Sequence, residues 1–290
     1  MDRPVMRSGT ATALGFGAVL LWASLASLTK LQGPIPPLQT TGLVFAVAAV
    51  VSVLVAALRG RLSCLKPTLG SLALGIYGLF GYHALYFAAL RLAPPAEAHL
   101  ISSLWALLTV LLSGFLPGQR LRAAHVIAAF IGFGGAASLV WDQLGSGNFS
   151  DTALTGFGFA LGCAVVWSTY SIGSRFFADV PSESIAVSCL AVSVLALCAS
   201  LAFESWVMPA GTQSWLALLG LGLGPVGMAF LLWDIGMKKG NVPLLGVLSY
   251  ASPIISTLLL IALGFAQATW ALAVAVGLMI AAAVIATRFG

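Results

Sequence analysis

PPLQTTGLVFAVAAVVSVLVAAL, residues 36–58, contains no charged side chain and is apolar over almost its whole length. A transmembrane helix requires about 20 mostly apolar residues in succession, which this stretch supplies. The strands of a membrane β-barrel instead alternate apolar and polar residues over about ten positions. The stretch therefore predicts a helix that crosses a membrane, and it excludes a barrel strand.

The composition of the whole chain agrees with this stretch. Of its 290 residues 60% are hydrophobic and only 7% are charged, and the mean hydropathy is +1.05. Soluble domains carry about a quarter charged residues, because a folded soluble chain needs a charged surface. The 13 basic and 8 acidic residues cannot supply that surface. The sequence therefore predicts an all-α integral membrane protein.

Glycine, proline and charged residues divide the chain into ten apolar segments, and the connections between them are mostly short. The first segment runs on to about Lys30 and is longer than the roughly 7–15 apolar residues of a signal peptide, so it is expected to remain as the first span. The predicted spans cover roughly residues 10–31, 36–58, 68–91, 94–117, 122–141, 152–177, 183–204, 213–237, 242–264 and 268–287.

The basic residues indicate how the chain is oriented. If both ends lie on one side of the membrane, that side holds eleven of the 13 basic residues, and the other side holds Lys30 and Arg91. Lysine and arginine gather in cytoplasmic connections, so both termini are expected to be cytoplasmic. The eleven residues are Arg3, Arg7, Arg59, Arg61, Lys66, Arg120, Arg122, Arg175, Lys238, Lys239 and Arg288.

The two halves of the chain share a pattern at a shift of about 145 residues. In the first half LLWAS, with Trp22, precedes Lys30 by eight residues (30 − 22). In the second half AVVWST, with Trp167, precedes Arg175 by the same eight (175 − 167). Chance matches between two polytopic segments are the alternative explanation, but a longer match follows.

Residues 81–108 lie over residues 227–254 without a gap, which places Ser103 on Ser249. We therefore predict two five-helix repeats, residues 1–145 and 146–290. Because five is an odd number, the second repeat would cross the membrane upside down relative to the first. Inverted repeats are typical of secondary transporters, whose substrate site lies near the midplane between the halves.

Polar and aromatic side chains fall near the middle of several predicted spans. Tyrosine and tryptophan normally gather at the membrane interfaces, so a group of them at mid-depth indicates a polar or wet interior. The alternative for each residue is ordinary packing, with its polar atom bonded to a neighbouring helix. The predicted substrate-binding residues are Trp22, Tyr82, His83, Tyr86, Ser102, Trp105, Trp167, Ser249, Tyr250 and Pro253.

Three ionisable residues within the spans need separate interpretation. His83 could bind a substrate carboxylate, relay a proton, or hold Tyr86 by a hydrogen bond. His99 is expected near the solvated outer interface, beside Glu97. Asp234 is expected to pair with Lys238, four residues later, near the cytoplasmic end of its span. With no carboxylate at the midplane, uncoupled movement of substrate is favoured over coupling to protons or sodium.

Several other functions are excluded or disfavoured. The four cysteines lack a C-x-x-C spacing, so neither a disulfide nor a metal site is expected. The basic residues form no run with interleaved aromatics, which excludes nucleic acid as a partner. No nucleophile and base pair is evident, so neither an enzyme nor a bound cofactor is expected. The sequence leaves the oligomeric state open, and a monomer is sufficient.

The chain resembles the EamA-type drug/metabolite transporters, in its ten predicted spans and two repeats. The segment ALYFAALRLAPPAEAHLISSLWALL is similar to the pattern A-L-x-x-A-P-x-x-A-x-L-I-x-x-L-W-P-L of the bacterial aromatic amino acid exporters. The resemblance implies export of aromatic and other neutral amino acids across a bacterial inner membrane, with Tyr82, His83, Trp105 and Trp167 shaping the site. Small-molecule substrate and membrane lipid are then the expected partners.

Two points qualify this resemblance. Ala106 stands where the family pattern favours proline, which puts the bend of the fourth span in doubt. Aromatic faces also attract cations, so proton-coupled efflux of lipophilic cations is the alternative function. A glutamate near the start of the first span would have favoured that alternative, and none occurs between Gly15 and Trp22.

Overall fold

The computed structural model describes residues 8–114, 122–145, 150–240, 245 and 248–289, and in these residues the chain is helical without any strand. The first half contains α1 (Ser8–Trp22), α2 (Leu25–Leu31), α3 (Pro37–Leu58), α4 (Leu69–Leu92), α5 (Pro95–Ser102), α6 (Trp105–Ser113) and α7 (Ala123–Gly145). The second half contains α8 (Asp151–Ser174), α9 (Ile185–Phe203), α10 (Gly211–Leu223), α11 (Ala229–Lys239), α13 (Ala251–Ala262) and α14 (Trp270–Arg288).

Helix occurs in each of the ten predicted ranges. Within the described residues six helical stretches are long and apolar enough to cross a membrane, and shorter apolar helices accompany them. The prediction of an all-helical membrane protein is therefore confirmed. The number of crossings and the inverted repeat remain predictions.

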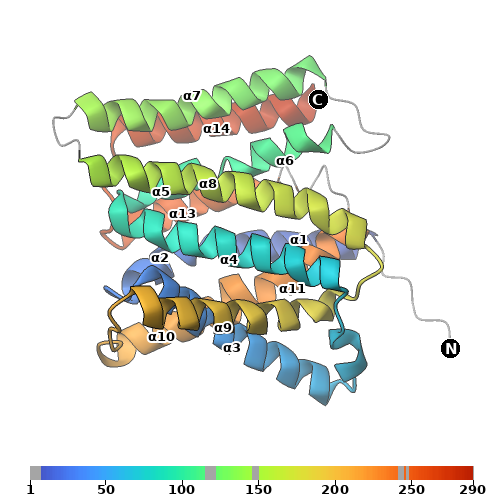
Figure 1. Cartoon of the computed structure of the whole chain (residues 1–290). Coiled ribbons are helices and arrows are strands. Elements are labelled where there is room, and N and C mark those ends of the chain that lie inside the picture. The colour runs from blue at the N-terminus through green and yellow to red at the C-terminus, as the bar shows by residue number, and fades with distance from the viewer. Residues whose placement is uncertain (1–7, 115–121, 146–149, 241–244, 246–247, 290) are drawn as a thin grey trace.

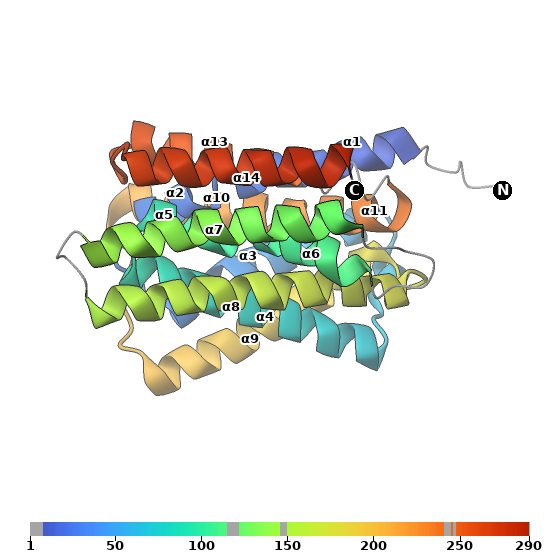
Figure 2. The same cartoon turned by 90° about the horizontal axis from the view of Figure 1, so that it is seen from above.

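The helices run side by side in one bundle (Figures 1 and 2). The pair α7 and α14 lies at one edge of the bundle, and the pair α3 and α9 lies at the opposite edge (Figure 1). Between these edges α4 packs along α8, and α1 packs along α11. The start of α1 and the end of α14 lie at the same end of the bundle (Figure 2).

Several helices are interrupted near the middle of the bundle. The chain turns at Ala23 and Ser24 between α1 and α2, and at Ser103 and Leu104 between α5 and α6. A π-helical turn, Gly224–Met228, joins α10 to α11 and contains Pro225. Irregular backbone inside a membrane protein is tolerated where it is buried in protein or lines a cavity.

The bend between α5 and α6 is present although Ala106 replaces the proline of the family pattern. Three donors converge on the carbonyl oxygen of His99: the hydroxyl of Ser102 at 2.8 Å, the hydroxyl of Ser103 at 2.8 Å, and the backbone N–H of Ser103 at 3.0 Å. Hydrogen bonds from serine hydroxyls to preceding carbonyls bend helices. The serines therefore account for the bend in place of proline.

Glycine permits a close approach between α4 and α8. A Cβ atom added at Gly78 would collide with the side chain of Tyr170. Gly158 lies on α8, and a Cβ atom added there would meet nothing within 4 Å. Small residues at helix contacts let two backbones pack closely in membrane proteins. Gly78 is therefore a packing residue, whereas Gly158 faces open space.

The start of α3 is fastened to the segment that follows α9. The carboxylate of Glu204 accepts hydrogen bonds from the backbone N–H groups of Leu38 and Gln39, both at 2.9 Å. The side chain of Gln39 also donates to the carbonyl of Val207 at 2.7 Å and accepts from its N–H at 3.0 Å. These bonds satisfy N–H groups that a helix start leaves without partners.

Candidate functional site

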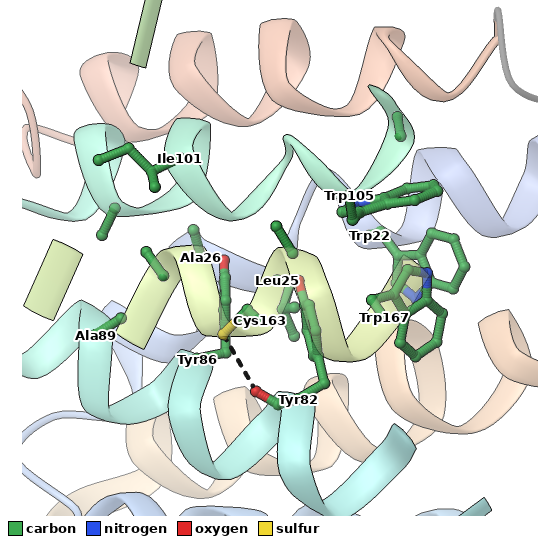
Figure 3. Packing of buried hydrophobic residues seen from close by; sticks show 14 of the residues in the cluster. Trp22, Leu25, Ala26, Tyr82, Tyr86, Ala89, Ile101, Trp105, Cys163 and Trp167 are labelled. Atoms are coloured by element: carbon green, nitrogen blue, oxygen red, sulfur yellow. Dashed lines mark hydrogen bonds between the residues drawn. The ribbon is translucent and has the colours of Figure 1, made fainter. Parts of the chain in front are cut away.

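A cluster of aromatic rings occupies the centre of the bundle. Trp22 on α1 lies edge-on to Trp167 on α8, with ring centroids 5.4 Å apart, and edge-on to Trp105 on α6 at 6.2 Å. Figure 3 shows these three indoles side by side. Trp233 on α11 adds a fourth indole, 5.1 Å from Trp22. Edge-to-face contacts at these distances are the favoured geometry for aromatic pairs.

Two tyrosines of α4 extend the cluster. The rings of Tyr82 and Tyr86 are stacked, with centroids 5.5 Å apart and planes inclined by 12° (Figure 3). Tyr82 also contacts Trp167 at 5.2 Å. The thiol of Cys163 donates to the carbonyl oxygen of Tyr82 at 3.5 Å, which ties α8 to α4 beside the stacked rings.

A small cavity lies within this cluster and encloses about 20 Å³. A cavity of this size holds roughly one water molecule. A molecule as large as an amino acid does not fit into this volume. The lining residues are Trp22, Leu25, Tyr82, His83, His99, Ser103, Trp105, Trp167, Phe230 and Ser252.

None of the ten lining residues is acidic, lysine or arginine. Two histidines, two serine hydroxyls, the indole N–H groups and one phenol supply the polar atoms. Among the residues that the structure describes, no group of three histidine, cysteine or acidic side chains is placed to hold a metal ion. The cavity thus combines aromatic faces with neutral hydrogen-bonding groups, which suits an uncharged or zwitterionic ligand.

The structure fixes the hydrogen bonding of His83. Its ring is 1% exposed, and Nδ1 lies 2.9 Å from the carbonyl oxygen of Leu79. Because a carbonyl only accepts, Nδ1 carries the hydrogen and donates it. The imidazole packs between Phe45 and Phe230, at 4.9 and 5.5 Å. The interpretation that His83 holds Tyr86 is wrong, because Tyr86 bonds to a different histidine.

That histidine is His99, which was expected at the solvated interface. It is instead 4% exposed, lines the cavity, and places Nδ1 2.7 Å from the hydroxyl of Tyr86. The expectation is wrong because α5 is covered by α8, α13, α7 and α14. Hydrophobicity and position along the chain alone do not show that neighbouring helices enclose α5 so completely.

The ten predicted site residues fall into two groups. Trp22, Tyr82, His83, Trp105 and Trp167 line the central cavity, and Tyr86 stacks directly behind Tyr82. The other four are buried without lining it: the hydroxyl of Ser102 bonds to the carbonyl of His99, and that of Ser249 to the carbonyl of Leu245, while Tyr250 and Pro253 lie nearby in the chain before and within α13.

Leu25, His99, Ser103, Phe230 and Ser252 also line the cavity and were not predicted. The spacing of Phe230 points to the site, because it lies three residues before Trp233 on the same helical face and both rings contact Trp22. Ser103 and Ser252 are each within three residues of a serine that was predicted. At the bend between α5 and α6, Ser103 lines the cavity and Ser102 does not.

A second, polar cavity of about 40 Å³ lies at the end of the bundle where α8 ends. Lys238 pairs with Asp234 at 2.8 Å, as the four-residue spacing predicted, and its ammonium also donates to the carbonyl of Val180 at 2.7 Å. Tyr170 and Ser174 line this second cavity. The helical face that continues from Trp167 therefore leads from the central cavity to this end.

A bundle of apolar helices with an aromatic cavity at its centre defines a helical membrane protein. The model of the EamA-like transporter family matches the chain twice, over residues 9–141 and 154–288. The chain belongs to this family.

Three comparisons place the chain within the family. It is 48% identical over 283 residues to the aromatic amino acid exporter YddG of Ancylobacter novellus, covering 97% of this chain and 98% of that protein. The exporter of the same name from Escherichia coli is 24% identical over 269 residues, covering 86% and 87%. A solved crystal structure superposes with a TM-score of 0.81 at 48% identity, covering 97% of this chain and 98% of the other.

Proposed function

We propose that this chain is a secondary transporter that exports aromatic and other neutral amino acids across a bacterial inner membrane by alternating access, with broad specificity and without coupling to an ion. The observation that carries the proposal is the central cavity, whose walls are indoles, phenol, imidazoles and hydroxyls without an acidic side chain. The name of the relative from Ancylobacter novellus, with 48% identity over nearly the whole chain, supports the substrate class.

Two inverted five-helix repeats, residues 1–145 and 146–290, would form the transporter. The two separate matches of the family model support this division. So does the pairing of helices: under the shift of about 145 residues α3 corresponds to α9 and α7 to α14, and these are partners in the bundle. Under the same shift α4 corresponds to α11, and α1 corresponds to α8. The pair α4 and α8 therefore corresponds to the pair α11 and α1, which also pack together.

The positions of two helix breaks agree with the same alignment. One break includes Leu104, before α6, and the other falls at Tyr250, before α13. They are 146 residues apart (250 − 104), which is also the shift between residues 81–108 and 227–254 (227 − 81). In inverted-repeat transporters such discontinuous helices border the substrate site at the midplane.

The chemistry of the cavity suits a zwitterion with an apolar side chain. Indole and phenol faces can surround an aromatic or aliphatic side chain, and they attract an ammonium group by cation–π interaction. Lipophilic-cation efflux coupled to protons usually needs a carboxylate in the pathway to exchange for the proton. The ten lining residues supply none, which favours the amino acid over the cation.

Access to the cavity requires movement because its volume of about 20 Å³ admits no amino acid. The interruption between α1 and α2 and the π-helical turn Gly224–Met228 lie on helices that pack together beside the cavity. Discontinuous helices are where such bundles bend. The polar cavity beside Lys238 lies at the end expected to be cytoplasmic, and it would receive the substrate from inside the cell.

Counterflow and uptake in proteoliposomes test the proposal. Labelled phenylalanine, threonine and methionine are offered with and without an imposed pH gradient, beside labelled tetraphenylphosphonium as the lipophilic cation. We expect uptake of the amino acids that the gradient does not alter, and its loss in Trp167→Ala but not in Trp270→Ala, which changes an indole that is 86% exposed. Gradient-driven uptake of the phosphonium alone would establish the alternative function.

A further inference from the structure

One residue in the wall of the central cavity has a buried polar atom that lacks a partner. His99 is 4% exposed, and its Nε2 has no hydrogen-bond partner among the residues that the structure describes. None of the other nine lining residues has a polar side-chain atom that is both fully buried and without a hydrogen-bond partner in the described part of the chain. A buried donor or acceptor left without a partner is unfavourable, so it marks a place where a ligand atom can complete the bonding.

The bond to Tyr86 determines what Nε2 offers. Nδ1 of His99 lies 2.7 Å from the hydroxyl of Tyr86. A phenol is a stronger acid than a neutral imidazole N–H, so the phenol donates and Nδ1 accepts. The hydrogen of the neutral ring is then on Nε2, because the partner of one ring nitrogen sets the tautomer. Nε2 is therefore a donor that needs an acceptor.

His83 differs from His99 in this respect. Its Nδ1 already donates to the carbonyl of Leu79, so its neutral ring has no second hydrogen to offer. Of the two imidazoles in the wall, only His99 can donate to a ligand while neutral. The serine hydroxyl of Ser103 donates to the carbonyl of His99 and is likewise engaged.

The donor is held in a fixed position. Tyr86 is fully buried and stacks on Tyr82, and the backbone carbonyl of His99 accepts three hydrogen bonds at the bend between α5 and α6. A donor that is oriented before the ligand arrives loses little conformational freedom on binding. Its natural acceptor in an amino acid is the carboxylate, because hydrogen bonds to a charged acceptor are the stronger ones.

We propose that the Nε2–H of His99 holds the carboxylate of the transported amino acid, and that Tyr86 orients this donor by fixing the histidine tautomer. The inference rests on the proposed amino acid transport and assigns one end of the substrate within the cavity. The ammonium group and side chain then lie toward the indoles of Trp22, Trp105 and Trp167, whose faces suit both.

Competition in proteoliposomes tests the assignment. Uptake of labelled phenylalanine is inhibited by unlabelled phenylalanine or by phenylalaninamide, which keeps the ring and the amino group but lacks the carboxylate. We expect the wild-type protein to prefer phenylalanine, and His99→Leu to reduce that preference about tenfold, the effect of losing one hydrogen bond to a charged group. His99→Gln, which retains an amide N–H at similar reach, should keep part of the preference.

Tyrosine variants separate orientation from general damage. Tyr86→Phe should reduce the preference by a smaller factor than His99→Leu. Tyr77 lies on the same helix, but its side chain is exposed and its hydroxyl is bonded to Thr169. Tyr77→Phe should therefore leave the preference for phenylalanine unchanged. Size exclusion in detergent shows whether His99→Leu folds. If it does not fold, a reduced preference for phenylalanine in Tyr86→Phe, with an unchanged preference in Tyr77→Phe, supports the role of His99.

The outcomes distinguish this inference from the proposed function. Wild-type protein that transports amino acids, with an unchanged preference in His99→Leu and Tyr86→Phe, would overturn the role of His99 and leave the exporter proposal standing. Wild-type protein that transports none of the neutral amino acids would overturn both.

Discussion

The indole nitrogen of Trp22 donates a hydrogen bond to the carbonyl oxygen of Pro225 at 2.9 Å, across 203 positions of the chain. The bond joins the end of α1 to the π-helical turn that precedes α11, and it holds the indole that contacts both Trp105 and Trp167. A single hydrogen bond therefore links an irregular turn of one half to the aromatic centre of the bundle.

Replacement of this indole by a ring without a donor should destabilise the bundle. Trp22→Phe removes this hydrogen bond, which contributes about 0.5–1.5 kcal/mol, and it also loses packing. Thermal unfolding in detergent measures the change. Trp270→Phe is the matched control, because Trp270 is 86% exposed, and its midpoint should stay near that of the wild type. Equal losses in both variants would contradict the role of the bond.

Two glycine substitutions on the α4 and α8 pair should change the stability of the protein in opposite directions. Gly78→Ala places a methyl group against the side chain of Tyr170 and should destabilise by about 1–3 kcal/mol, because the helices must move apart. Gly158→Ala meets nothing within 4 Å and should stabilise by up to about 1 kcal/mol through helix propensity. Unfolding midpoints of the two purified variants decide this, and a loss in both would show that Gly158 also packs.

Removal of the charge from Glu204 should loosen the start of α3. Glu204→Gln loses the carboxylate that accepts from Leu38 and Gln39, and about 1 kcal/mol of stability should be lost. Glu183→Gln is the control, since Glu183 forms a partly exposed ion pair with Arg61 at 2.6 Å, and such pairs contribute about 0–1 kcal/mol. Denaturation in matched detergent compares the two, and a larger loss in Glu183→Gln would refute the capping role.

Cysteine labelling should report the orientation in the membrane. Cys64 lies in the connection between α3 and α4, which the distribution of basic residues predicts to be cytoplasmic. A membrane-impermeant maleimide should label it in inside-out vesicles and not in spheroplasts. Ala210→Cys, in a Cys64→Ser background, lies in the exposed connection between α9 and α10 and should show the reverse. The same accessibility for both positions would contradict the predicted topology.

The sequence predicts the helices of this protein well because membrane helices are specified by continuous apolar runs. The run at residues 36–58 becomes α3 (Pro37–Leu58), and that at 68–91 becomes α4 (Leu69–Leu92), each within one residue at either end. Five of the predicted site residues also meet at one cavity, since indoles and phenols at mid-depth stand out against hydrocarbon.

The remainder of the site depends on tertiary packing. The spacing of Ser102, Trp105 and Thr109 defines a common face only if the helix is continuous, and the bend at Ser103 and Leu104 changes the direction of the chain within that face. The burial of His99 depends on the helices that cover α5, which the sequence of α5 does not contain. Phe230 was not predicted because its side chain has no polar atom, and only its spacing from Trp233 points to it.

The bend between α5 and α6 differs chemically from one that proline would impose. The backbone N–H of Ala106 donates to the carbonyl of Ser103 at 3.3 Å, a bond that proline at this position could not make. The angle between the two half-helices is therefore set by exchangeable hydrogen bonds from Ser102, Ser103 and Ala106 rather than by a covalent ring. A break of this kind keeps every backbone N–H, whereas a proline ring would remove one donor from the chain permanently.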